Sequence, residues 1–294
     1  MTPSSATTFV IATRDRAPEL IAVLLRLLDT TPCPIVVVDN ASSDDSVGRA
    51  TQLGHTSGGR LRVVPLQRNV GAVARNIGVT QAETPFIAFC DDDSWWESAA
   101  IPAAERLFAR HATVGLLAGR TVVEPDRGDD PMVAELAASP LGHVDGLPGP
   151  SILGFLACTS IVRRTAFLGV GGFSPILEFR GEERLLAWDL AAAGWDICFC
   201  PQLVAHHHPS VTRPSDARQR ARAMRNDVLT TWLRRPVGDC LRAARSFARA
   251  AASDPAHAAA LGEAMRMLPA VARARRPLPE DVERAVRTLE VARC

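Results

Sequence analysis

Lysine and tyrosine are both absent from the 294 residues of this chain, so all 33 of its strongly basic side chains are arginines. No apolar run approaches the roughly 20 residues that span a bilayer, and the N-terminus lacks the basic-then-apolar pattern of a signal peptide. The seven cysteines form no C-x-x-C pair, which predicts free buried thiols in a reducing cytoplasm. No G-x-G-x-x-G follows the first predicted strand, which excludes a Rossmann dehydrogenase.

The charges are distributed unevenly along the chain. Residues 1–213 contain 17 arginines and 23 acidic residues, whereas residues 214–294 contain 16 arginines and 9 acidic residues. This contrast indicates two structural units, so we predict a main domain over residues 1–212 and an Arg- and Ala-rich helical extension over residues 213–294. Breaks between the helices of the extension are expected at four prolines: Pro236, Pro255, Pro269 and Pro277.

The extension interleaves acidic residues with its arginines and has no series of aromatic side chains for stacking on bases. Nucleic acid is therefore not an expected partner. Three other roles stay open for these helices. These roles are packing on the main domain, a homodimer contact, and peripheral contact with an anionic membrane.

Short apolar runs alternate with segments of helical spacing through the main domain. The alternation predicts an α/β fold with a mostly parallel sheet flanked by helices. Strands are expected at 8–13, 34–39, 61–66, 85–90, 114–123 and 195–205, and helices at 18–28, 45–53, 71–81, 97–110 and 181–193. Residues 124–150, with five prolines and four glycines, are expected to form a long irregular loop.

Polar clusters follow four of these strands, at 13–16, 39–44, 69–76 and 91–93. Open α/β sheets bind ligands beyond the carboxyl ends of their strands. The agreement between the polar clusters and the strand ends therefore predicts a ligand site at that edge of the sheet.

The cluster with the clearest chemistry is Asp91-Asp92-Asp93. Three adjacent carboxylates repel one another and resist burial without a cation. A hard divalent ion, Mg²⁺ or Mn²⁺, would neutralise them and bridge two phosphates, and the D-x-D spacing puts Asp91 and Asp93 on one side of an extended segment. A solvated acidic turn is the alternative interpretation.

Four further positions have both a functional and an ordinary interpretation. Asp39, at the end of a strand, would accept hydrogen bonds from a base or a ribose, or simply shape a turn. Arg75, near the start of a helix, would bind a phosphate, or lie on the surface. Glu182 and Glu183 open a helix after Gly181, either as ordinary partners of the helix dipole or as a general base.

Three consecutive histidines, His206, His207 and His208, follow the last predicted strand. In strand geometry His206 and His208 share one side and His207 takes the other. A histidine there would complete a metal shell that holds a carboxylate and phosphate oxygens. A surface or core-edge cluster is the alternative.

Together these motifs resemble family 2 of the glycosyltransferases, which have the GT-A fold, over roughly residues 7–212. The resemblance depends on the order of the motifs and not on any single one. The matching segments are ATRDR at 12–16, VVVDNASSDDS at 36–46, NVGAVARNIG at 69–78, DDD at 91–93, Arg-Arg at 163–164, Gly-Gly-Phe at 171–173, Gly-Glu-Glu at 181–183, Gly194, and a strand that ends in histidine.

The resemblance implies an inverting, non-processive enzyme that moves a sugar from a UDP-, GDP- or dTDP-sugar to an acceptor hydroxyl with the help of Mn²⁺ or Mg²⁺. Glu183 would be the base, with Glu182 as the second candidate. The metal would be held by Asp93 and His207, with His206 and His208 as alternatives to His207. The donor would be bound by Thr13, Arg14, Asp39, Asn69, Arg75, Asp91 and Asp92.

Several positions depart from the family pattern. The base is Glu where Asp is commoner, Leu185 stands where the family often has a second Asp, and Asp189 where it often has Arg. Acceptor recognition is therefore expected to be unusual. The Q-x-x-R-W element of processive members is absent, and Arg225-Asn226 with Trp232 is only a loose echo of it.

Two alternatives remain on the same fold. A non-catalytic protein that binds sugar nucleotides or carbohydrates would not need both the D-x-D motif and Glu183. A sugar nucleotidyltransferase would usually begin with a glycine-rich phosphate loop, which ATRDR does not provide. We take the 124–150 loop and the residues near Trp95, Trp96 and Trp188 as candidate acceptor contacts.

Overall fold

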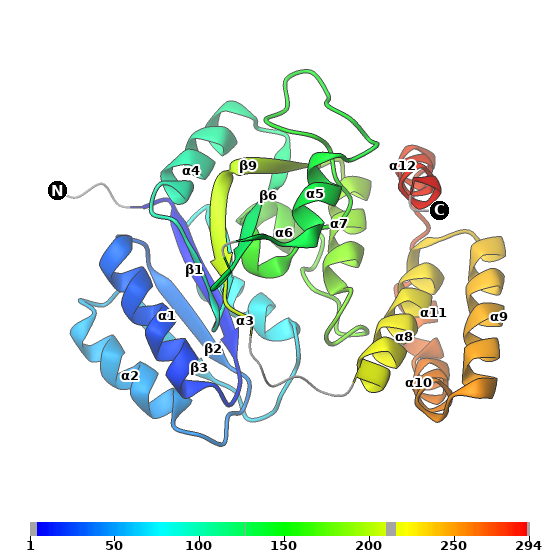
Figure 1. Ribbon diagram of the computed structural model, residues 1–294, viewed down its shortest axis with the longest axis horizontal. Helices are drawn as coiled ribbons and strands as arrows, with labels where there is room; N and C mark the ends of the chain where they lie inside the picture. Colours follow the sequence, from blue (N-terminus) through cyan, green and yellow to red (C-terminus); the bar gives the residue numbers. More distant parts are fainter. Residues whose placement is uncertain (1–4, 127, 210–215, 293–294) are drawn as a thin grey trace.

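The computed structural model describes residues 5–126, 128–209 and 216–292. One sheet, flanked by helices, occupies the N-terminal two thirds of the chain, and a group of helices follows it (Figure 1). The strands run in the order β3-β2-β1-β4-β8-β6-β9-β5, and β7 pairs with β6. The predicted α/β class is confirmed.

The parallel half of the sheet contains β1 (Thr7–Thr13), β2 (Ile35–Asp39), β3 (Leu61–Pro65) and β4 (Phe86–Asp91). Their apolar runs are continuous because helices cover both faces, so side chains from both sides of a strand are buried. In β1, Phe9, Val10 and Ile11 have no exposed surface. The carboxyl ends of these four strands meet at one edge, as the sequence predicted.

The other half of the sheet mixes directions. β8 (Ser160–Arg163) is antiparallel to both β4 and β6 (Val114–Val123), and β6 is parallel to β9 (Asp196–His207). The short strand β5 (Ser94–Trp96) pairs antiparallel with the end of β9, with Ser94 opposite His207 and Trp95 opposite His206. This non-local pairing places the acidic triplet next to the three histidines.

Helices cover the two faces with two separate hydrophobic cores. On one face lie α1 (Ala17–Thr30), α2 (Ser46–Thr56) and α4 (Ala100–Arg110). On the other lie α3 (Val73–Gln81), α5 (Pro131–Ala137), α6 (Arg164–Gly169) and α7 (Glu182–Ala192). Apart from α5 and α6, each matches a predicted helix within a few residues.

The segment 124–150 differs from the predicted long irregular loop, because parts of it form regular structure. It contains β7 (Gly128–Asp129) and α5. The Asp130 side chain accepts a hydrogen bond of 2.9 Å from the Met132 N–H, and Pro131 occupies the first position of α5. An N-cap aspartate followed by proline is a helix-start signal, and here it begins a helix inside a segment whose prolines and glycines predict a loop.

The C-terminal helices are α8 (Asp216–Arg234), α9 (Val237–Ser253), α10 (Pro255–Arg266), α11 (Leu268–Ala274) and α12 (Glu280–Val291). They lie together beside α7 (Figure 1). The breaks expected at four prolines are confirmed, because Pro236 and Pro255 begin α9 and α10, Pro269 is in the first turn of α11, and Pro277 precedes α12. Within the described ranges, no helix is long and apolar enough to cross a membrane.

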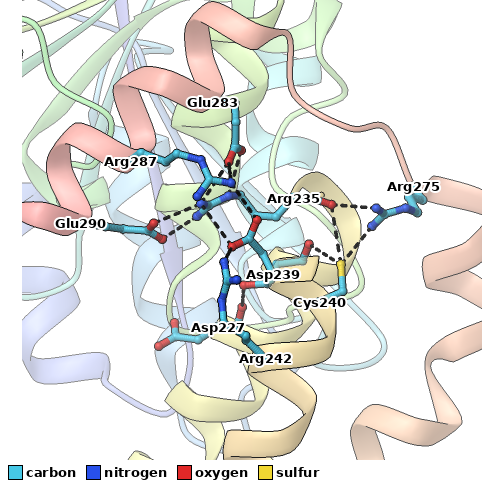
Figure 2. Close-up of polar contacts among 10 residues, drawn as sticks. Asp227, Arg235, Asp239, Cys240, Arg242, Arg275, Glu283, Arg287 and Glu290 are labelled. Atoms are coloured by element: carbon cyan, nitrogen blue, oxygen red, sulfur yellow. Dashed lines mark hydrogen bonds and ion pairs between the residues drawn. The ribbon is translucent and has the colours of Figure 1, made fainter. Parts of the chain in front are cut away.

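The core of these helices also includes residues of the main domain. Ile176, Leu177 and Leu185 are buried in one cluster with side chains of α8, α9, α10 and α11. At the end of α8, Arg235 is buried and forms ion pairs with Glu283 and Glu290 of α12 (Figure 2). The extension is therefore packed on α7, and ion pairs connect α8 with α12 inside it.

Candidate functional site

The loops that follow β1 and β2 are joined by hydrogen bonds. The Asp15 carboxylate accepts hydrogen bonds from the Ser43 N–H at 2.6 Å and from the Ser43 hydroxyl at 2.9 Å. In return, the Asp15 N–H donates to the Ser42 hydroxyl at 2.9 Å. Asp39, buried at the end of β2, accepts hydrogen bonds from both the N–H and the hydroxyl of Ser42. These bonds fix the edge of the sheet where the strands end.

The loop before α3 is held by Asn40, a residue to which we had assigned no role. Its side chain accepts a 3.0 Å hydrogen bond from the Val70 N–H and donates a 3.1 Å bond to the Gly71 carbonyl oxygen. Asn69 uses its own side chain to accept from the Gly71 N–H at 2.9 Å, and it is exposed. This loop sets the start of α3 and therefore the position of Arg75.

Each aspartate of the triplet is paired with at least one arginine, and Asp92 and Asp93 share Arg16. Asp91 is paired with Arg75, which is only 5% exposed. Asp92 accepts a 2.7 Å hydrogen bond from Thr13 and lies 3.1 Å from the Arg16 Nε. Burial raises the pKa of Asp92 to about 7, even though Arg16 and Thr13 lower it.

Asp93 lies between Arg16 and His207. Its Oδ2 is 3.1 Å from the Arg16 Nη2, and its Oδ1 is 3.5 Å from the His207 Nε2. Burial raises the pKa of Asp93, but the hydrogen bond to His207 and the charges of His207 and Arg16 outweigh it, so the pKa lies below its ordinary value. The same hydrogen bond raises the pKa of His207.

The three histidines point in different directions. Of the three, His207 is the one that faces Asp93. The His206 Nδ1 lies 2.9 Å from Glu124 and its Nε2 lies 3.3 Å from Glu97, and its ring stacks on Trp95 at 5.3 Å. The His208 side chain is exposed, and its backbone N–H donates to the Asp93 carbonyl oxygen at 2.8 Å. The structure therefore brings His207, and neither His206 nor His208, to the aspartates by its side chain.

In the part of the chain that the structure describes, no three His, Cys, Asp or Glu side chains are arranged to hold a metal ion by themselves. At the triplet, the Asp93 Oδ1 and the His207 Nε2 offer two metal ligands that lie 3.5 Å apart. Mg²⁺ is commonly bound by one or two carboxylates, with substrate phosphates and water filling the other positions. The donor set therefore fits a divalent ion that arrives together with a diphosphate.

The two glutamates at the start of α7 lie beside Arg75. Glu182 is 1% exposed, and its Oε2 has no hydrogen-bond partner. Burial, with repulsion from Glu183, raises the pKa of Glu182 to about 8. Burial also raises the pKa of the half-buried Glu183. Burial lowers the pKa of Arg75, but the negative charges of Asp91, Glu182 and Glu183 outweigh burial, so the pKa lies above its ordinary value. The Arg75 guanidinium therefore interacts electrostatically with both the triplet and the glutamates.

Most of the residues predicted from the sequence converge at this edge. They are Thr13, Asp39, Arg75, Asp91, Asp92, Asp93, Glu182, Glu183 and His207. Arg14 does not join them, because its side chain is half exposed and pairs with Asp15. Arg16 binds two of the aspartates, but no role beyond its place in the ATRDR motif was predicted for it. The available signal was an arginine after β1, at the same edge of the sheet as the predicted acidic site.

Two of the tryptophans that mark the predicted acceptor contacts, Trp96 and Trp188, are themselves core residues, and contact by their neighbours stays a prediction. Trp96 is 1% exposed and donates to the Phe89 carbonyl oxygen at 3.0 Å. Trp188 is also buried, near the guanidinium groups of Arg184 and Arg235. Trp95 lines a cavity of about 730 Å³ with α1 residues and His206, and its role in acceptor contact stays a prediction.

Comparison with known proteins assigns the chain to a protein family. The model described as glycosyl transferase family 2 matches residues 8–170. A pre-mycofactocin glycosyltransferase of Mycobacterium tuberculosis is 30% identical over 202 residues, which cover 63% of this chain and 40% of that protein. The chain thus spans about two fifths of the length of the curated relatives that it matches.

Solved structures share the fold. The mannosyltransferase PcManGT from Pyrobaculum calidifontis, in complex with GDP-Man and Mn²⁺, has a TM-score of 0.62 and 19% identity, over 99% of this chain and 87% of that one. Residues 1–349 of S. aureus TarS, in complex with UDP-GlcNAc, have a TM-score of 0.59 and 16% identity, over 95% of this chain and 83% of that one. The GT-A fold predicted from the sequence is thereby confirmed.

Proposed function

This chain belongs to glycosyl transferase family 2, and on that premise we propose that it is an inverting glycosyltransferase that moves a sugar from a nucleoside-diphosphate donor to an acceptor hydroxyl. One observation carries the proposal. The buried Arg75 pairs with Asp91 beside Glu182 and Glu183, and Asp93 of the same triplet faces His207. All of them lie at the edge of the sheet where α/β folds bind ligands. Both a leaving-group site and a candidate base are thus present at one place.

The donor would lie across the strand ends. Asp39 would contact the base or ribose, and Asp91 and Asp92, oriented by Arg75 and Thr13, would contact the ribose and the sugar. Asp93 and His207 would hold Mn²⁺ or Mg²⁺, which supplies Lewis-acid stabilisation of the diphosphate leaving group. Arg16 pairs with both Asp92 and Asp93, and its positive charge offsets part of the repulsion between these carboxylates.

Glu183 would take the proton of the acceptor hydroxyl as it attacks the anomeric carbon from the face opposite the diphosphate. The attack forms the new glycosidic bond while the bond to the diphosphate breaks, so the anomeric configuration inverts. Glu183 is half-buried, whereas Glu182 is closed off from solvent, which favours Glu183 for contact with an acceptor. A raised pKa makes a carboxylate a better base near neutral pH.

The donor class is proposed from the relatives. PcManGT is in complex with GDP-Man and TarS with UDP-GlcNAc, so UDP- and GDP-sugars are the first to test, with dTDP-sugars after them. A cytoplasmic location, and contact of the extension with a second copy or a membrane surface, stay predictions.

The first experiment is a thermal-shift screen of UDP, GDP and dTDP with and without Mn²⁺. One nucleotide should raise the Tm, and most of that rise should need the metal. Asp93→Ala and His207→Ala should lose the metal-dependent rise. His208→Ala is the matched control, because the His208 side chain is exposed and the site uses only its backbone N–H.

Turnover then separates an enzyme from a binding protein. With the donor found in the screen and water as the acceptor, nucleoside diphosphate should be released slowly, and Glu183→Gln should stop the release without weakening donor binding. If donor binds but the wild type releases no nucleoside diphosphate, the enzyme proposal fails and the non-catalytic binding protein replaces it. If release persists unchanged in Glu183→Gln and Glu182→Gln, neither glutamate is the base. An inverted product, observed by NMR with an alcohol acceptor, would establish the single displacement.

A further inference from the structure

A buried side chain of the C-terminal extension, Asn226 of α8, binds the backbone of the segment that leads into α7. Asn226 is 1% exposed. Its amide nitrogen lies 3.0 Å, 2.9 Å and 2.6 Å from the carbonyl oxygens of Leu177, Phe179 and Arg180. Its amide oxygen accepts a 2.7 Å hydrogen bond from Arg225, so the orientation of the amide is fixed.

The segment held by Asn226 has a backbone that does not persist without support. Glu178, Arg180 and Gly181 have φ angles of 62°, 76° and 79°. For residues with a side chain, this left-handed region costs roughly 1–2 kcal/mol each, and such conformations persist where the surroundings fix them. Three carbonyl oxygens that converge on one buried amide provide that constraint.

The opposite side of the same segment meets the loop before α3. The Ala72 N–H donates a 2.6 Å hydrogen bond to the Glu178 carbonyl oxygen. Residues 177–181 therefore lie between the loop that positions Arg75 and helix α8 of the extension. The next two residues along the chain are Glu182 and Glu183.

Helix α7 itself is also fastened to α8. Arg184 pairs with Asp227, and Arg234 binds Asp189 through two nitrogens. Leu185 is buried in the core of the extension, and α8 is anchored at its far end by Arg235 (Figure 2). α8 is thus a rigid support on which the start of α7 is placed.

We propose that Asn226 is a positioning residue for the glutamates of α7, and that the extension contributes to turnover through it. The inference rests on the proposed function, in which one of these glutamates is the base. Asn226 touches neither donor nor acceptor. It fixes the 177–181 backbone and, through it, the place of Glu182 and Glu183 relative to Arg75.

The test separates turnover from donor binding. Asn226→Ala removes the donor to the three carbonyl oxygens, and Asn226→Asp replaces it with an oxygen that repels them. We expect either change to lower kcat for donor hydrolysis about 10- to 100-fold, which equals roughly 1.4–2.8 kcal/mol in the barrier, while the donor KM stays within about threefold. Thr231→Ala, which removes a hydroxyl that bonds within α8, should leave kcat and KM unchanged.

A second readout reports on the backbone. Hydrogen exchange of the 176–184 amides should become faster in Asn226→Ala and stay unchanged in Thr231→Ala. The milder Asn226→Gln keeps the amide but shifts it by one methylene, and it serves if Asn226→Ala does not fold. A lower kcat at an unchanged donor KM is expected for Asn226→Gln as well.

The inference is overturned if the Asn226 variants turn over donor like the wild type. It is also overturned if kcat/KM falls only because the donor KM rises while kcat is unchanged. Glu182→Gln and Glu183→Gln are measured alongside. If those two variants keep full turnover, the base assigned in the proposed function is wrong. If they lose turnover while the Asn226 variants do not, only the role of Asn226 has failed.

Discussion

Gly71 gives the sharpest test of how the site is assembled. Its φ of 61° lies in the left-handed region, and a Cβ added there would collide with the Glu178 carbonyl oxygen and come within 2.9 Å of the Glu178 carbonyl carbon. Gly58 has a similar φ of 65°, but a Cβ there would meet nothing within 4 Å. The pair therefore separates backbone strain from the contact between the two loops.

Gly58→Ala should cost only the strain, about 1–2 kcal/mol. Gly71→Ala carries the same strain and must also move the 178–181 backbone, which adds about 1–3 kcal/mol by analogy with overpacked cores. Urea denaturation followed by circular dichroism gives both free energies of unfolding, provided that the m-values agree. Because the contact adjoins Arg75 and the glutamates, Gly71→Ala should also weaken donor binding and Gly58→Ala should not.

Equal losses of stability in the two variants, within about 0.5 kcal/mol, would refute this reasoning, because the loops would then be free to separate. Preserved donor binding in Gly71→Ala would show that the contact does not position the site. A crystal structure of Gly71→Ala with an unmoved 178–181 backbone would refute it as well.

Three other changes test separate parts of the site. Arg16→Ala should increase the affinity for Mn²⁺ without nucleotide, measured by calorimetry, because it removes the cation paired with two aspartates, whereas Arg14→Ala, which makes no such contact, should not. In the folded state Glu182 has a pKa of about 8, against 4.5 for an ordinary glutamate. Between pH 4.5 and 8 the unfolded state therefore binds fewer protons than the folded state. The wild type should lose stability as the pH rises through this range. Glu182→Gln should flatten that part of the Tm-against-pH curve, and an unchanged slope would argue against a neutral buried Glu182. Leu185→Asp, which restores the commoner family residue, should destabilise the protein by about 3 kcal/mol or more in urea, because the side chain lies in the core of the extension.

The sequence was sufficient where local pattern determines structure. Continuous apolar runs located the parallel strands, and the polar residues after them located the edge that carries the site. It could not identify β5, because three residues with two tryptophans form a strand only through pairing with β9. That pairing also decides that His207, and not His206, faces Asp93.

Other parts of the site depend on contacts between distant segments. The role of Asn226 follows from carbonyl oxygens 46 to 49 positions earlier in the chain, and no local pattern indicates such a contact. Arg75 was expected on a phosphate, but its guanidinium lies among carboxylates that come from two distant motifs, the acidic triplet and the Gly-Glu-Glu segment. The departure at Leu185 is explained by the extension, which supplies an apolar environment for it.

The position of α7 between two cores has a consequence for how the protein is made. Leu186 and Leu190 pack on the sheet side, whereas Leu185 packs with α8, α9, α10 and α11. A nascent chain that has left the ribosome only as far as residue 212 already contains every aspartate, histidine and glutamate of the site. Its helix α7 nevertheless still exposes one apolar side to water, so helices α8 to α11 complete the glutamate end of the site, and its maturation waits until they have been synthesised.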